Sequence, residues 1–109
     1  MAVPKAAPPA SALSPARRRL VALMQRINFG RVEHLAVRGG EPVLDPMPRV
    51  VVEYKFAAEN GPRPETGRPD FALKAQVVDL FHLLDRVGDG TLPVLSVKHG
   101  VPFLAEIPG

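Results

Sequence analysis

The residues best suited to acid–base or metal chemistry are three histidines, His34, His82 and His99. None stands three or four residues from another histidine, and the strongest local pairing is that of His82 with Asp79, one helical turn before it. Such a pair could serve in a metal or acid–base site, but it is more often a surface contact. The serines and glycines form none of the nucleophile-elbow, phosphate-loop or dinucleotide-binding motifs. We therefore expect a protein that is not an enzyme and that holds no cofactor or metal ion.

Basic residues gather in the first half of the chain. Residues 1–49 hold eight Lys or Arg against three Asp or Glu, although the whole chain has a formal net charge of only +3. Arginine binds phosphate through a planar guanidinium, so this half could follow a nucleic-acid backbone, but a solvated surface explains the same residues. The candidate nucleic-acid contacts are Arg17, Arg18, Arg19, Arg26, Arg31 and Arg38.

Length and composition favour one small folded domain. The chain has 109 residues, of which 46% are hydrophobic, and it has no cysteine. It can therefore bury a modest core without disulfides, and a reducing compartment suits it. Residues 1–13 are rich in Ala and Pro, so we expect a disordered tail before a single domain over residues 14–109. Because we find no signal peptide and no apolar run of transmembrane length, we expect a cytoplasmic protein without a membrane partner.

One segment occurs twice, at residues 17–44 and again at 77–104, with a constant offset of 60 and no gap. The nine identical pairs are Leu20/Leu80, Leu23/Leu83, Arg26/Arg86, Gly30/Gly90, Leu35/Leu95, Val37/Val97, Gly40/Gly100, Pro42/Pro102 and Leu44/Leu104. Nearly all are leucines, valines, glycines or prolines, so the repeat predicts a shared scaffold rather than a shared chemical site. One copy is too short to bury its apolar faces alone, so two copies should share one core.

Each copy is expected to form a helix followed by a β-hairpin. Ser14 and Pro15 suit the start of the first helix, whereas Asp70 suits the start of the second. Two-residue turns are expected at 39–40 and 99–100, and a long strand at Arg49–Phe56. The result is an α+β fold in the order αβββαββ, with two helices on one face of a mainly antiparallel sheet of about five strands.

The region between the copies, residues 57–69, contains glycine and three prolines. These residues predict an exposed loop of unusual length. The simpler interpretation is a spacer, and the alternative is a binding loop that carries Arg63 and Arg68.

The run Ile27-Asn28-Phe29-Gly30-Arg31-Val32, followed by Val37 and a turn that ends at Gly40, resembles the core of the YezD-like small bacterial proteins. In that uncharacterised family, a short helix leads to a Phe-Gly pair, a strand, a turn and a returning strand. The resemblance covers about 25 residues of the first copy, and Asp89-Gly90 replaces the Phe-Gly pair in the second. It implies a bacterial or phage origin and a helix–hairpin unit, but no functional residue.

Two functions remain open. The first is a small assembly or accessory protein that binds a partner protein or a second copy of itself. Its candidate contacts are Val78 and Phe81, which widen the apolar face of the second helix, and Tyr54. The alternative is a basic module that binds DNA or RNA phosphates through the first half of the chain. We favour the first, because it explains the apolar helix and requires less of a modest charge.

Overall fold

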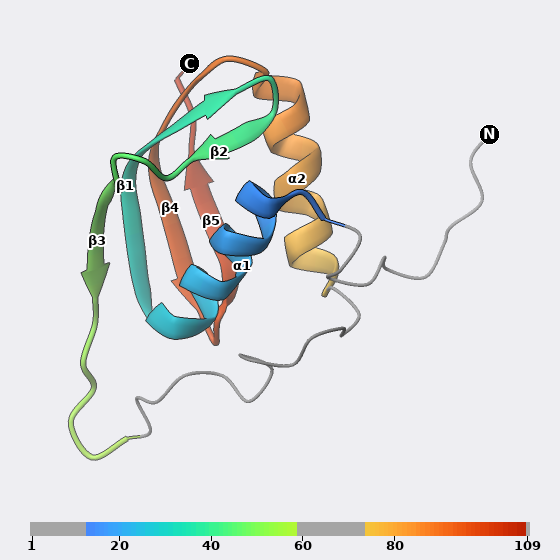
Figure 1. Cartoon of the computed structure of the whole chain (residues 1–109). Helices are drawn as coiled ribbons and strands as arrows, with labels where there is room; N and C mark the ends of the chain where they lie inside the picture. Colours follow the sequence, from blue (N-terminus) through green and yellow to red (C-terminus); the bar gives the residue numbers. More distant parts are fainter. Residues whose placement is uncertain (1–12, 59–73, 109) are drawn as a thin grey trace.

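The computed structural model describes residues 13–58 and 74–108 (Figure 1). Most of the predicted tail, most of the 57–69 loop with Arg63 and Arg68, and the predicted cap Asp70 lie outside these residues. The elements are α1 (Pro15–Ile27), β1 (Gly30–Arg38), β2 (Glu41–Val43), β3 (Arg49–Val52), α2 (Ala75–Val87), β4 (Gly90–Lys98) and β5 (Val101–Glu106). This is the predicted α+β fold, in the predicted order.

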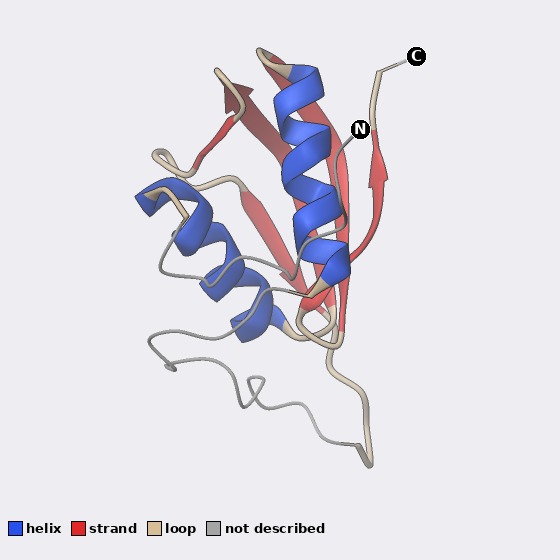
Figure 2. Ribbon diagram, turned by 90° about the vertical axis from the view of Figure 1, so that its right-hand side faces the viewer, coloured by secondary structure: helices blue, strands red, loops and turns tan. Residues whose placement is uncertain are grey.

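Both helices begin and end for local reasons. The Ser14 hydroxyl oxygen accepts a hydrogen bond from the backbone N–H of Arg17, and Pro15 occupies the first helical position, as predicted. Asn28 ends α1 with a φ of 63° and donates its N–H to the Met24 carbonyl. Helix α2 follows Lys74, which makes no side-chain cap, and ends at Gly88 with a φ of 67°. Figure 2 shows both helices on the same face of the sheet.

The sheet is antiparallel, with the strand order β2-β1-β4-β5. Its centre is the pair β1–β4, in which Gly30 lies opposite Val97 and Val37 lies opposite Gly90. Strands β2 and β3 pair with different parts of β1, β2 with residues 36–38 and β3 with residues 30–33. Among the described strands, β5 therefore forms one edge of the sheet, and β2 with β3 forms the other.

The predicted hairpin turns are present, and β1 also bends in its middle. The residues of the two turns, 39–40 and 99–100, all have positive φ values between 54° and 77°. His34 has a φ of 56° inside β1, which the sequence did not predict. At this bend the buried positions shift from residues 30 and 32 to residues 35 and 37, so the alternation along β1 moves by one residue.

Strand β3 is shorter than predicted. It ends at Val52 rather than at Phe56, because its neighbour β1 begins at Gly30, directly opposite Val52. One further hydrogen bond joins the Glu53 N–H to the Phe29 carbonyl at 2.7 Å. Tyr54 and Phe56 therefore lie beyond the sheet instead of continuing the strand face of Val50 and Val52.

The core is one apolar cluster drawn from both halves of the chain. Its most deeply buried side chains are Leu20, Met24, Val32, Leu35, Val37, Leu84, Leu92, Leu95 and Val97. The elements also correspond at the offset of the sequence repeat, since α1 and α2 run over 15–27 and 75–87, and β1 and β4 over 30–38 and 90–98. The correspondence describes the two halves; their origin by duplication stays a prediction.

Candidate functional site

Arg17 was predicted to contact nucleic acid, but its side chain instead makes contacts within the protein. Its Nη2 donates to Asp85 Oδ1 at 2.6 Å and to the Gly40 carbonyl at 2.9 Å. Its guanidinium carbon also lies 5.0 Å from the centroid of the Phe81 ring. With a side chain only 17% exposed, Arg17 joins α1, the β1–β2 turn and α2. Its role in this structure is to connect these elements.

Two further candidate arginines form ion pairs with carboxylates. Arg19 Nη1 lies 2.8 Å from Asp45 Oδ2, and Arg31 Nε lies 2.7 Å from Glu33 Oε2. The hydrogen bond from Arg31 lowers the pKa of Glu33, and the one from Arg19 lowers the pKa of Asp45. The same contact raises the pKa of Arg19. These two carboxylates neutralise the positive charges of Arg19 and Arg31, so the two arginines are less available to bind phosphate groups.

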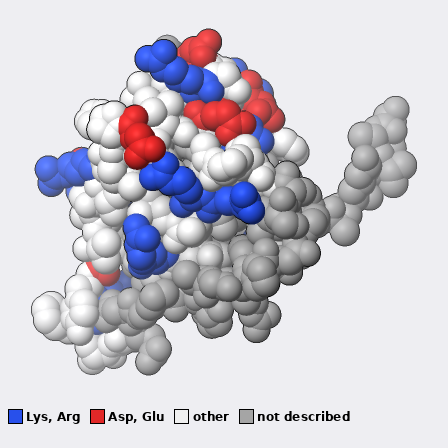
Figure 3. Space-filling view, viewed as in Figure 1, with Lys and Arg blue, Asp and Glu red and all other residues white. Residues whose placement is uncertain are grey.

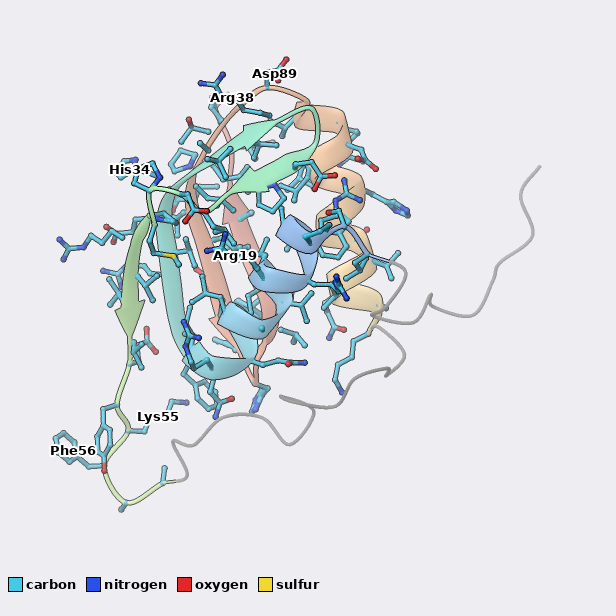
Figure 4. The ribbon with its side chains drawn as sticks, viewed as in Figure 1. Arg19, His34, Arg38, Lys55, Phe56 and Asp89 are labelled. Atoms are coloured by element: carbon cyan, nitrogen blue, oxygen red, sulfur yellow. The ribbon has the colours of Figure 1, made fainter. Side chains whose placement is uncertain are left out.

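The other three candidates, Arg18, Arg26 and Arg38, are exposed and have no ion pair with any described residue. We call them the exposed arginines. Arg18 and Arg26 lie on α1, whereas Arg38 lies at the end of β1 near the β1–β2 turn (Figure 4). Acidic side chains lie beside the basic ones on the face shown in Figure 3. The structure does not bring the six predicted contacts into one uniformly basic surface.

The predicted partner contacts divide into buried and exposed residues. Phe81 is only 4% exposed and belongs to the core, so the prediction that it offers a partner surface is wrong. It fills the space between the sheet and Arg17 instead. Val78 is half-buried against the core. Tyr54 is 69% exposed, and its ring lies 5.5 Å from that of Phe56, which is also exposed (Figure 4).

Large apolar side chains lie exposed along both outer strands of the sheet and just beyond them. On the β3 side they are Met47, Val52, Tyr54 and Phe56, and on the β5 side Phe103, Leu104 and Ile107, with exposed fractions between 50% and 88%. Of these residues, only Tyr54 was predicted from the sequence as a partner contact. Alternation in a strand shows which residues share a face, but it does not show which strand lies at an edge or how far it is paired.

A groove of about 220 Å³ lies between α2 and β5, and we call it the α2–β5 groove. Its apolar lining includes Leu80, Leu83 and Phe103, and Asp79 and Arg86 add one charge of each sign. Leu104 also lines it and is 56% exposed, whereas Leu44, at the equivalent position of the first half, is 3% exposed in the core. The two halves therefore differ most clearly where β5 meets α2.

The histidines form no metal-binding group in the part of the chain that the structure describes. His34, His82 and His99 are all exposed, and no group of three or more His, Cys, Asp or Glu could hold a metal ion there. His99 packs its ring edge-on against Phe29 at 4.9 Å. Neither described helix has the length and apolar character needed to cross a membrane.

No family model, curated protein or solved structure matches this chain. The YezD-like resemblance of residues 27–40 thus stays a prediction.

Proposed function

We propose that this chain is a small non-catalytic accessory protein that binds another protein surface through the outer strands of its sheet. One observation carries the proposal. Among residues 13–58 and 74–108, seven large apolar side chains are at least half exposed, and all seven lie on β3, on β5 or in the segments next to these strands. The concentration of apolar side chains at both sheet edges supports contact with a protein.

The physical reason is that these sheet edges expose both apolar side chains and unpaired backbone N–H and C=O groups. Apolar surface gains about 25 cal/mol for each Å² that leaves water, and contiguous exposed patches are typical of interaction sites. An edge strand also presents backbone N–H and C=O groups that another strand can pair with. A protein partner satisfies both at once, whereas a nucleic acid offers neither strand pairing nor an apolar surface of this shape.

The alternative, a nucleic-acid-binding module, rests on the exposed arginines. They are the only members of the predicted set without a carboxylate partner among the described residues. Three dispersed charges supply far less than the six or more phosphate contacts of a typical duplex-binding surface. The protein-binding function is therefore the better supported of the two.

We also propose that the two halves arose by duplication and that the protein works in a reducing compartment such as the cytoplasm. The shared element bounds and the β1–β4 register support the first proposal. The absence of cysteine from the whole sequence supports the second.

Photo-crosslinking in the cells that produce the protein tests the proposed function. A benzophenone amino acid would replace Tyr54 in one variant and Leu104 in another, with Ala22, an exposed residue on α1, as the matched control. We expect discrete covalent adducts from the sheet-edge positions and none from position 22. An absence of adducts at both edges, or the same adducts from all three positions, would contradict the proposal.

A further inference from the structure

We infer that a second copy of this chain occupies the α2–β5 groove, with the two β5 strands antiparallel and the two α2 helices side by side. This inference rests on the proposed function and names the partner at one of its two edges. The pair would form one continuous sheet of two five-stranded halves, related by a two-fold axis.

Strand β5 has the features of an edge that accepts another strand. It is six residues long and pairs with β4 on one side only, among the strands described. Glu106 is its only charged residue, and Pro102 at its other end removes a single backbone donor. Antiparallel pairing about the middle of β5 would place Glu106 against the far end of the second strand, so like charges would not meet. Pro102 and the register shift at Ser96/Val97, which leaves Phe103 opposite no residue of β4, protect part of this edge, so pairing would use the remaining outward N–H and C=O groups of β5.

The helix above this edge carries a self-complementary stripe. Gln76, Asp79, Leu83 and Arg86 all line the groove, and their spacing of three and four residues places them on one face of α2. In an antiparallel pair of helices, Asp79 of each copy would face Arg86 of the other, with Leu83 near the two-fold axis. Two ion pairs would thus flank an apolar centre.

Both charges of this stripe are available for such a contact. Asp79 and Arg86 are exposed, and neither forms an ion pair with any residue in the described ranges. Helix α2 and strand β5 lie on the same side of the molecule, so one approach of a second copy reaches both (Figure 1). Phe103 and Leu83 would then leave water inside the interface instead of lining an open groove.

The opposite edge of the sheet does not have this self-complementarity. Strands β2 and β3 have three and four residues, and the segment between them contains Pro46 and Pro48. A hollow of about 260 Å³ beside β3 holds Arg26 with apolar residues but no carboxylate. The lining of this hollow offers no carboxylate to Arg26 of a second copy, and the short interrupted strands are poor templates for pairing. A second copy therefore fits β5 and α2 better than β3 and α1.

Sedimentation equilibrium of the full chain over a range of concentrations tests the inference. We expect the wild type to approach twice its chain mass of 11.8 kDa. Asp79→Arg and Arg86→Asp each place two pairs of like charges across the axis, so each variant alone should weaken the dimer at least tenfold. An equimolar mixture of the two variants should recover the dimer, because every facing pair is again of opposite sign. Arg26→Asp, the equivalent change on α1, is the matched control and should leave the dimer unchanged.

Three results would overturn the inference. They are a wild type that stays monomeric to several hundred micromolar, a dimer that neither charge reversal weakens, and a mixture that remains monomeric although both variants retain wild-type circular dichroism. The proposed protein-binding function is tested by a different result from the one that tests the dimer. A monomer that still forms adducts with another protein from position 54 would remove the second copy as partner and leave the binding function in place.

Discussion

Replacement of Gly30 by alanine should separate β3 from the sheet. Gly30 has a φ of 157°, which residues with side chains rarely adopt. A Cβ at this position would overlap the backbone oxygen of Val51 and lie 2.9 Å from Ile27 Cγ2, where carbon atoms normally stay about 3.5–4.0 Å apart. Because Val51 pairs with Arg31, the overlap can be relieved only by moving β3 away from β1.

The expected cost follows from these two effects. Backbone strain costs about 1–3 kcal/mol and an overpacked site costs about as much, so we expect a loss of roughly 2–6 kcal/mol in the free energy of unfolding. For a domain of this size, a loss of 2 kcal/mol lowers the melting temperature by about 8 °C or more.

The second half of the chain provides a matched control. Gly90 is the equivalent residue of β4, its φ lies outside the left-handed region, and an added Cβ would lie 3.3 Å from Val87 Cγ1. We expect Gly90→Ala to change stability by less than about 1 kcal/mol, since a small clash is offset by the lower entropy of the unfolded chain. Urea denaturation followed by circular dichroism measures both variants, and hydrogen exchange at residues 50–52 reports on β3. Equal effects of the two changes, or a Gly30→Ala protein as stable as the wild type, would refute the reasoning.

Three further predictions concern the core, the ion pairs and the exposed arginines. Leu44→Ala should lower the free energy of unfolding by about 2–5 kcal/mol, because it leaves a cavity in the core. Leu104→Ala, the same change at the exposed equivalent position, should lower it by about 0.5 kcal/mol or less in dilute protein. Denaturant titration of both variants measures the difference. The folded-state pKa values of Glu33 and Asp45 are lowered below their ordinary values of 4.5 and 3.8. In acid, the unfolded chain therefore binds more protons than the folded chain. The stability that these two carboxylates provide is lost as the pH falls through their folded-state pKa values. Thermal melts should therefore show a shallower acid dependence for Glu33→Gln/Asp45→Asn than for the wild type, and identical profiles would contradict this linkage. Alanine at all three exposed arginines should leave retention on immobilised duplex DNA or RNA unchanged; a fall of about 2.7 in the slope of log affinity against log salt would instead show that they contact phosphates.

Local signals in the sequence were sufficient to predict the order of the elements. Ser14 caps α1 because its hydroxyl accepts from the Arg17 N–H in the first turn, and Pro15 suits the first helical position; both effects act over a few residues. The two hairpin turns were predictable for the same reason, since a two-residue turn needs positive φ values, which glycine adopts most readily. The repeat at an offset of 60 also anticipated that α2 and β4 would correspond to α1 and β1.

Features that depend on distant partners were not predictable. Strand β3 ends at Val52 because β1 begins opposite it, which alternation inside residues 49–56 does not reveal. Phe81 looked like excess apolar surface on a helix, but it is covered by the sheet and by Arg17 from the other half of the chain. Arg17 itself looked like a free charge, although its carboxylate partner, Asp85, lies 68 residues away. The groove between α2 and β5 likewise depends on how two elements pack, so no single segment of the sequence indicates it.

Amide hydrogen exchange measured at several protein concentrations tests the proposed interaction edge most directly. We predict that amides of β5, residues 101–106, exchange more slowly as the concentration rises, because their outward N–H groups become paired. Amides of β3, residues 49–52, should exchange at a constant rate. Exchange at β5 that does not change with concentration, or protection that appears at β3 instead, would contradict a second copy of the chain at the β5 edge.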